Sequence, residues 1–234
     1  MSTATASSRP VSYADANVRS EFIRRTYTHL AFAILGFLVV ENMLLSWSGA
    51  PALISMMMGY GWLFVMIGFM GVSWLADKWA RSDASPNMQY LGLGLYIVAE
   101  AVIFLPMLYI ASNFSSPDVI PTAGLMTSLL FLGLTFTAFT TKKDFSFLRG
   151  MLSIGGFIAM GVIVCSILFG FSLGLFFSTI MVAYAAGSIL YTTSNIIHHY
   201  RPDQHVAASL ALFAGVALLF WYVLQILMSL GGDD

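Results

Sequence analysis

Charged residues are scarce in this chain. Only 9% of its 234 residues are Asp, Glu, Lys or Arg, whereas soluble domains carry about 25%. The net charge of −1 leaves no basic excess of the kind that favours nucleic acid. The single cysteine, Cys165, excludes an intrachain disulfide. Because 59% of the residues are hydrophobic, the composition predicts an integral membrane protein surrounded by a lipid bilayer.

Hydrophobic residues, by contrast, form long runs. About 20 apolar helical residues, each rising about 1.5 Å, cross the roughly 30 Å hydrocarbon core of a bilayer. No run alternates polar and apolar residues with a period of two, which excludes a membrane β-barrel. We therefore predict an all-α, seven-transmembrane helical bundle over residues 24–234, preceded by a polar cytoplasmic segment over residues 1–23. The predicted spans are 28–45, 51–76, 88–111, 119–140, 151–171, 173–197 and 206–230.

The positions of the cations predict the orientation of this bundle. All ten Lys and Arg residues lie before the first run or in every second connection. Lys and Arg are retained on the cytoplasmic side of membranes, which places the N-terminus in the cytoplasm and the C-terminus outside it. Residues 2–17 are polar and contain no cleavable signal sequence, so we expect a flexible N-terminal segment and an uncleaved first span.

Two acidic residues, Glu41 and Glu100, lie inside the first and third runs. A carboxylate in hydrocarbon costs several kcal/mol unless it is protonated or paired. Each glutamate lies about 18–20 Å from the start of its span, so the two side chains could face each other and share a proton or a cation. Alternatively, each is neutral and hydrogen-bonded to Asn42 or to a backbone carbonyl. Both interpretations remain open.

A polar string closes the sixth run and defines a second candidate region. Its hydroxyl groups could bond carbonyls four residues earlier on their own helix. They could instead line a water-filled vestibule at the cytoplasmic end, together with Thr140, Thr141 and Gln225. The string consists of Thr192, Thr193, Ser194 and Asn195.

Signatures of catalysis and of metal binding are missing. The chain contains no Gly-x-Ser-x-Gly, no His-Glu-x-x-His and no phosphate-binding glycine loop. His198, His199, His205 and Asp203 cluster in the last connection, but adjacent histidines on a helix point about 100° apart. This spacing favours a solvated turn over a zinc site. We expect a protein that is not an enzyme and has no cofactor.

Two stretches resemble a known family. Residues 140–152 read TTKKDFSFLRGML and residues 191–198 read YTTSNIIH. Both are similar to the Bax inhibitor-1 (transmembrane Bax inhibitor motif) family, most nearly to its bacterial YccA-like branch, and the likeness extends over most of the chain from Arg24 onward. The resemblance implies a bacterial inner membrane protein whose final helix is wrapped by the other six.

The resemblance also implies two possible functions. Active family members resemble pH-sensitive calcium leak channels that two aspartates close, and the matching positions here are Thr192 and Gly215. Neither residue can attract calcium or titrate. The chain would then be a non-catalytic regulatory or accessory module of a membrane protein complex, with modulation of an FtsH-type protease as the family-level suggestion. The alternative is a pH-sensitive calcium or cation leak channel in which Glu41 and Glu100 replace the aspartates.

Overall fold

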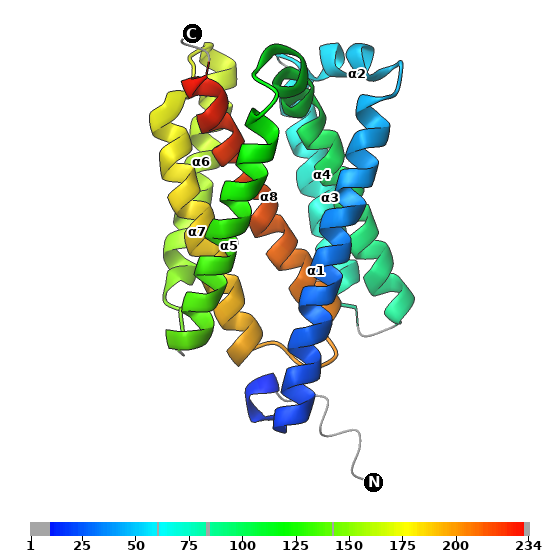
Figure 1. The fold of residues 1–234 in the computed structure, drawn as a ribbon, viewed down its shortest axis with the longest axis vertical. Helices are drawn as coiled ribbons and strands as arrows, with labels where there is room; N and C mark the ends of the chain where they lie inside the picture. The colour runs from blue at the N-terminus through cyan, green and yellow to red at the C-terminus, as the bar shows by residue number, and fades with distance from the viewer. Residues whose placement is uncertain (1–9, 60, 83–84, 142, 232–234) are drawn as a thin grey trace.

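The computed structural model describes residues 10–59, 61–82, 85–141 and 143–231. These residues form one short 3-10 helix and eight α-helices, and they contain no β-strand (Figure 1). The elements in chain order are η1 (Val11–Tyr13), α1 (Ala16–Leu45), α2 (Ala50–Met57), α3 (Gly61–Ala80), α4 (Pro86–Phe114), α5 (Val119–Thr141), α6 (Leu148–Phe169), α7 (Gly174–His198) and α8 (His205–Leu230).

Seven of these helices, all except α2, are long and apolar enough to cross a membrane. The prediction of an all-α bundle with seven membrane spans is therefore confirmed. The described Lys and Arg side chains lie at the end of the bundle where α1 begins and where α3 ends. We call this the basic end and the opposite end the far end.

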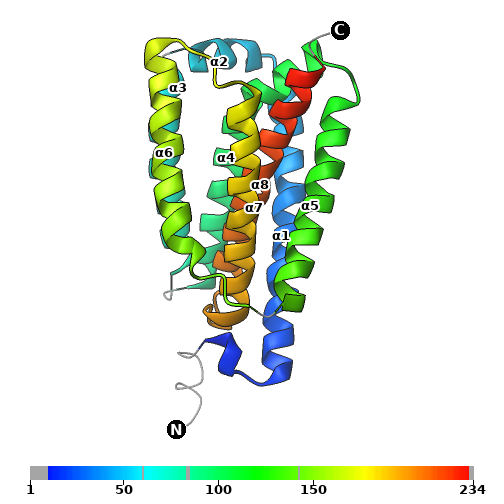
Figure 2. The same ribbon diagram turned by 90° about the vertical axis from the view of Figure 1, so that its left-hand side faces the viewer.

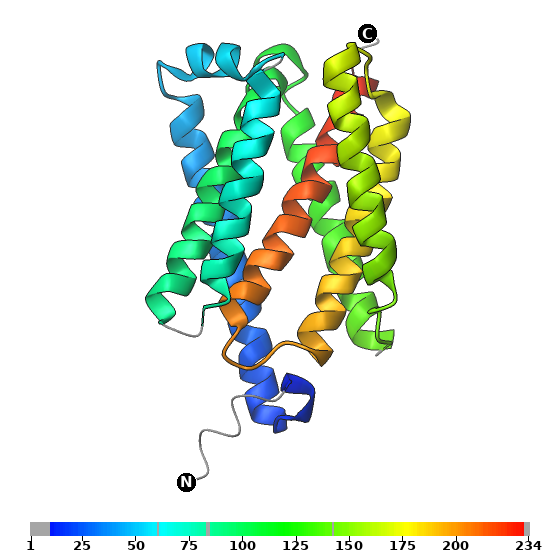
Figure 3. The same ribbon diagram turned by 180° about the vertical axis from the view of Figure 1, so that it is seen from behind.

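The second predicted span, residues 51–76, is wrong in its boundaries. The structure divides it into α2, which lies across the far end of the bundle, and α3, which crosses (Figures 1 and 3). The chain leaves the helical conformation at Met58, where ψ is 160°, and turns at Gly59 with a φ of +60°. Glycine adopts this left-handed conformation without a steric penalty. Hydrophobicity alone could not reveal the break, because both sides of the turn are apolar.

Helix α8 passes obliquely through the middle of the bundle (Figures 1 and 3). It packs against α1, α3, α4, α5 and α7, whereas α6 packs mainly against α7. The expected central C-terminal helix is confirmed, with five helices making the extensive contacts around it. Helix α8 is apolar on all sides, which favours a central position. Accordingly, Leu212, Leu219 and Leu224 are fully buried along its length.

The described part of the N-terminal segment is ordered and docked, which corrects the expectation of a flexible segment there. The Val11 side chain is fully buried, and its N–H donates to the carbonyl of Tyr200 at 2.8 Å. The Ser12 hydroxyl donates to the carbonyl of His198 at 3.0 Å. These bonds satisfy carbonyls at the end of α7 that have no partner within the helix, and Figure 2 shows η1 beneath the α7–α8 turn. Residues 1–9 lie outside the described residues.

The first helix also begins earlier than the predicted domain boundary. Helix α1 runs without interruption from Ala16 to Leu45, so residue 23 lies within a helix. The ion pairs of Glu21 with Arg24 and Arg25 lie on this first part of α1, where the polar sequence concealed a helix that continues into the membrane span.

Candidate functional site

A cavity of about 490 Å³ lies inside the bundle, bounded by α3, α4, α6, α7 and α8. Its wall is strongly aromatic. Trp62 stacks on Trp221 with ring centroids 6.1 Å apart, and Phe104 meets Trp221 edge to face at 5.0 Å. Such pairs contribute about 0.5–1.5 kcal/mol each beyond the area that they bury. The packed rings therefore line the cavity, which lies between α3 and α6.

A second cavity, of about 730 Å³, adjoins the first toward the far end. Trp62, Trp221 and Gln225 line both cavities. The second cavity is bounded by Gly59 before α3 and by Gly170 after α6. Together the two cavities extend from the middle of the membrane span to the far end, with residues of α3 and α6 in both linings. Figure 3 shows the ribbons of these two helices on the same side of the bundle.

Glu100 supplies the carboxyl group of the first cavity, which we call the inner cavity. Its side chain is only 6% exposed, and it lines the cavity wall from the middle of α4. Tyr96, one turn earlier on α4, also lines this cavity. Gln225 of α8 also lines the cavity, and its side-chain carbonyl oxygen Oε1 is buried without a hydrogen-bond partner. Both groups offer oxygen acceptors to a space lined mainly by apolar and aromatic side chains, with the hydroxyl-bearing Tyr184, Ser188 and Tyr222 among them.

Glu41 lies elsewhere, on the buried stripe of α1 that also contains Ala33 and Phe37. Both carboxyl oxygens of Glu41 are buried and lack a hydrogen-bond partner. The Phe37 and Phe104 rings pack 5.2 Å apart. Glu41 lies one turn beyond Phe37 toward the far end and Glu100 one turn before Phe104, so the two glutamates are offset by about 12 Å along their helices.

This arrangement does not contain the carboxyl pair that the sequence suggested. The two carboxyl groups are not hydrogen-bonded to each other, because Glu41 has no partner. The alternative bond from Glu41 to Asn42 or to a backbone carbonyl is also not formed. Equal distances from the predicted span starts suggested a common depth, but α1 begins twelve residues before the predicted start of its span.

Thr192 and Gly215, the positions that the resemblance matched to the family's two aspartates, are buried and uncharged. Thr192 is 9% exposed. A Cβ atom added at Gly215 would lie 3.0 Å from Cγ1 of Ile189, closer than ordinary van der Waals contact, and Ile189 is itself fully buried. Helices α7 and α8 therefore approach too closely at Gly215 for a side chain to fit without displacing Ile189.

The two stretches that carried the family resemblance lie together at the basic end. The Ser194 hydroxyl of α7 accepts a hydrogen bond from the Phe145 N–H at 2.9 Å, and it lies 3.4 Å from Oδ1 of Asp144. The other Asp144 oxygen, Oδ2, lies 3.3 Å from Nε2 of His199. The α5–α6 connection is thus fixed to the end of α7 through three side chains.

Residues 19–232 match the family described as "Inhibitor of apoptosis-promoting Bax1". The chain belongs to the Bax inhibitor-1 family. It is 32% identical over 224 residues to an uncharacterised protein of Pseudomonas aeruginosa, covering 92% of each chain. It is 27% identical over 229 residues to the "Golgi anti-apoptotic protein" of vaccinia virus strain Lister, covering 93% of this chain and 89% of the viral one.

A relative with a named role is the "Modulator of FtsH protease YccA" of Escherichia coli K12. The two sequences are 29% identical over 168 residues, which cover 71% of this chain and 74% of the relative. The same protein of E. coli O6:H1 is named "Inner membrane protein YccA". This Bax inhibitor-1 family member is thus a multi-span membrane protein with bacterial relatives.

In this family member, replacing Ser194 tests the connection between the two family stretches. We expect Ser194→Ala to lower the free energy of unfolding by about 1 kcal/mol, because the partly buried Phe145 N–H loses its acceptor. Thermal unfolding in detergent measures the change. Thr179→Ala is the matched control, since that exposed hydroxyl bonds only a carbonyl of its own helix. An equal effect of the two substitutions would contradict a special role for Ser194.

Asp144 makes the same connection sensitive to acid. The Ser146 backbone N–H, which donates to Asp144 at 2.9 Å, lowers the pKa of Asp144, and His199 contributes to the shift. A folded-state pKa below the ordinary value stabilises the fold above about pH 4. We expect this contribution to disappear as the pH falls further. Melting temperatures of the wild type and Asp144→Asn should then converge as the pH falls through the lowered pKa of Asp144, and parallel curves would contradict the prediction.

Glu41 gives a third testable prediction. We expect Glu41→Leu to raise the free energy of unfolding by about 1–2 kcal/mol, because an apolar side chain of similar size replaces a buried group without partners. Glu41→Gln is the control and should leave stability nearly unchanged, since its amide would be equally unpartnered. Detergent-denaturation midpoints measure both effects. Destabilisation by leucine would indicate that the carboxyl group has a polar partner.

The described residues of the polar string of α7 and those expected to line a vestibule with it have separate surroundings. Ser194 bonds the α5–α6 connection, whereas the Thr193 hydroxyl is buried without a partner. Asn195 contributes its backbone carbonyl, which accepts the His199 N–H at 2.7 Å. Thr140 and Thr141 bond carbonyls of their own helix. Gln225 lies near the far end of α8, because α8 runs from the basic end to the far end.

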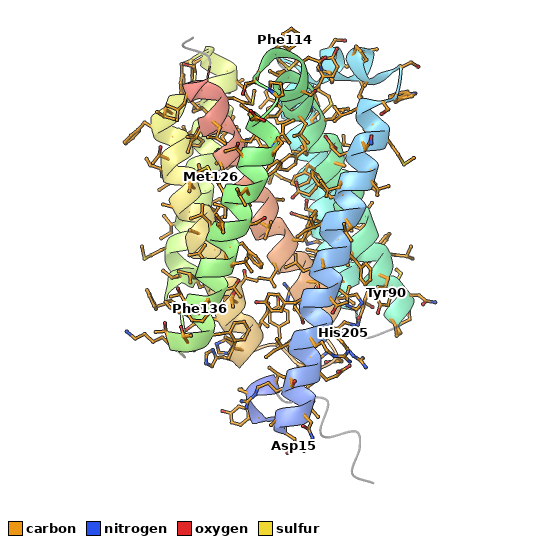
Figure 4. All side chains as sticks on the ribbon, viewed as in Figure 1. Asp15, Tyr90, Phe114, Met126, Phe136 and His205 are labelled. Carbon is orange, nitrogen blue, oxygen red and sulfur yellow. The ribbon has the colours of Figure 1, made fainter. Side chains whose placement is uncertain are left out.

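A histidine cluster that sequence reasoning missed joins α1, α4 and α8 at the basic end. His29 stacks on Tyr90 with centroids 5.5 Å apart and meets His205 edge to face at 4.9 Å. Figure 4 shows Tyr90 and His205 near each other beside α1. His198 and His199 lie at the end of α7 instead, and the described residues contain no group of three or more metal ligands. The sequence separation of 61 between His29 and Tyr90 concealed their contact.

Proposed function

We propose that this protein is a non-catalytic module that regulates or accompanies a membrane protein complex. The observation that carries the proposal is the uncharged contact between Gly215 and Ile189. At one of the two positions that the resemblance matches to the family's aspartates, this chain packs two helices together. Fold and family are retained, while these two positions carry a threonine and a glycine, which cannot attract or gate calcium.

An FtsH-type membrane protease is the partner that we propose. Support comes from the E. coli relative, which is named a modulator of FtsH protease. The docked η1 segment adds a physical argument, because residues 1–9 precede an anchor held by Val11 and Ser12. A partner that binds this polar terminus would connect mechanically to the α7–α8 turn. We further propose that the basic end faces the cytoplasm of a bacterial inner membrane.

Affinity purification tests the partnership. We expect the full chain, tagged after Asp234 and solubilised in mild detergent, to recover an FtsH-type protease in a fixed ratio. Deletion of residues 2–9 should reduce recovery at least fivefold while leaving the melting temperature unchanged, because the Val11 and Ser12 contacts remain. Recovery of the tagged chain without any partner protein would overturn the proposal.

Calcium flux distinguishes the module from the leak channel. We expect purified protein in liposomes loaded with a calcium dye to show no more flux than empty liposomes between pH 6 and pH 8. The separation of Glu41 from Glu100 supports this expectation, because a single carboxyl group is a poor calcium site. A pH-dependent flux that disappears in Glu41→Gln or Glu100→Gln would establish the leak and overturn our proposal.

A further inference from the structure

We propose that the inner cavity binds a hydrophobic ammonium cation, with Glu100 pairing its charge. The proposal concerns a ligand site within the bundle and does not depend on the partnership proposed above. It is carried by three features of the cavity, namely its size, its aromatic wall and the chemistry of its polar groups.

The size of the cavity suits a small organic molecule. A volume of about 490 Å³ lies within the range of about 300–1,000 Å³ that is typical of ligand pockets. The adjoining space of about 730 Å³ offers a route from the far end and from between α3 and α6. A ligand that partitions into the bilayer could therefore enter without crossing the basic end.

Aromatic rings favour a cation in this space. Tyr96, Tyr184, Trp221 and Tyr222 all line the cavity. Tyr96 and Tyr222 are 7% and 5% exposed, respectively, so water competes little for their faces. A cation within about 6 Å of such a ring is attracted by the negative face of the π system, and desolvation strengthens this attraction.

The polar groups of the cavity select the sign of the charge and the kind of donor. Glu100 is the acidic group among the lining residues, and none of those residues is Lys or Arg. Gln225 adds the buried, unpartnered oxygen Oε1. An ammonium group has N–H donors for the Glu100 carboxylate, whereas a quaternary cation has none. Because Trp221 contacts Phe104, Gln225, one turn beyond Trp221, lies about two helical turns from Glu100 and is too distant for the same ammonium group.

A calcium ion does not fit the same groups. Calcium takes six to eight oxygen ligands, but Glu100 is the one carboxylate among the lining residues, and the described residues contain no group of three or more His, Cys, Asp or Glu that could hold a metal ion. The apolar remainder of the wall would also leave most of the hydration shell of a metal ion uncompensated. An organic cation instead brings an apolar body that the aromatic side chains can cover.

Equilibrium dialysis with tritiated 4-phenylbutylamine tests the proposal. The protein is embedded in phosphatidylcholine nanodiscs, with empty nanodiscs measuring partition into lipid. We expect saturable binding of one amine per chain and at least tenfold weaker binding of the neutral analogue 4-phenylbutanol. Equal binding of the two compounds, or no saturable binding above the empty discs, would overturn the proposal.

Two substitutions locate the site. Glu100→Gln should weaken amine binding at least tenfold, whereas Glu41→Gln should leave it unchanged, because Glu41 is equally buried but does not line the cavity. If Glu100→Gln does not fold, as judged by circular dichroism and gel filtration, Ala214→Phe supplies the test. This substitution fills the cavity and retains Glu100, so it should also abolish binding. Unchanged binding in a folded variant of either kind, or displacement of the amine by submillimolar calcium, would overturn the assignment.

Discussion

Replacing Gly215 by aspartate is expected to lower the free energy of unfolding by about 3–5 kcal/mol, because the new side chain is both too large and charged in an apolar environment. Its Cβ atom would lie 3.0 Å from Ile189 Cγ1. Its carboxylate would then enter a cavity that already contains Glu100 and no Lys or Arg. We expect unfolding midpoints in detergent to fall accordingly, and we expect no calcium flux to appear.

A double-mutant cycle isolates the steric cause from the effect of the charge. Gly215→Ala adds the steric conflict without the charge, and Ile189→Ala removes the atom that opposes it. The two changes combined should therefore cost less than the sum of their separate effects, with a coupling of about 1 kcal/mol or more. Additive costs would show that Ile189 does not restrict position 215. A stable Gly215→Asp variant that conducts calcium would contradict our interpretation of the α7–α8 contact.

The second large effect is expected at Gly92, where α4 lies close to the backbone of α3. A Cβ atom at this position would lie 2.6 Å from the Ala76 carbonyl oxygen and 2.7 Å from the Ala80 backbone nitrogen. Backbone atoms cannot move aside as a flexible side chain can, so α3 would have to shift as a whole. We expect Gly92→Ala to cost about 2–3 kcal/mol. Small residues are typical of such close helix contacts in membranes.

Gly94 provides a matched control on the same helix. Nothing lies within 4 Å of a Cβ atom added there, and the residue is exposed. Gly94→Ala should therefore stabilise α4 by up to about 1 kcal/mol through its higher helix propensity. Thermal unfolding of both variants measures the contrast. Equal effects at the two positions would contradict a close α3–α4 contact. Since both helices line the ligand cavity, Gly92→Ala should also weaken amine binding.

The sequence predicted much of the fold because membrane insertion acts on local properties. Hydrophobic length predicts a span, and the number of spans agrees with the structure. The error at residues 51–76 arose from the same property, since Gly59 turns the chain within an apolar run. The helical start of α1 was missed because its first residues are mainly polar. Polar residues such as Glu21, Arg24 and Arg25 form a helix stabilised by ion pairs one turn apart.

The candidate site was predictable only in part. Glu41 and Glu100 stood out because carboxyl groups are rare in hydrocarbon. Whether they meet depends on how α1 and α4 pack, and the Phe37–Phe104 contact offsets them. The aromatic cavity could not be predicted, because its wall combines residues of five helices. Aromatic residues also lie on the exposed surface of the bundle, for example Phe64, Trp74 and Phe136.

By itself, the sequence determined that this chain is a seven-span helical membrane protein of the Bax inhibitor-1 family, because hydrophobic length and the family stretches are local patterns. The tertiary structure decided which polar groups meet. It joined Asp144 to His199 and Ser194, separated the two buried glutamates, and left a cavity beside Glu100. The physical reason is that these relations depend on the offsets and crossing angles of packed helices, which are set by contacts between residues distant in sequence.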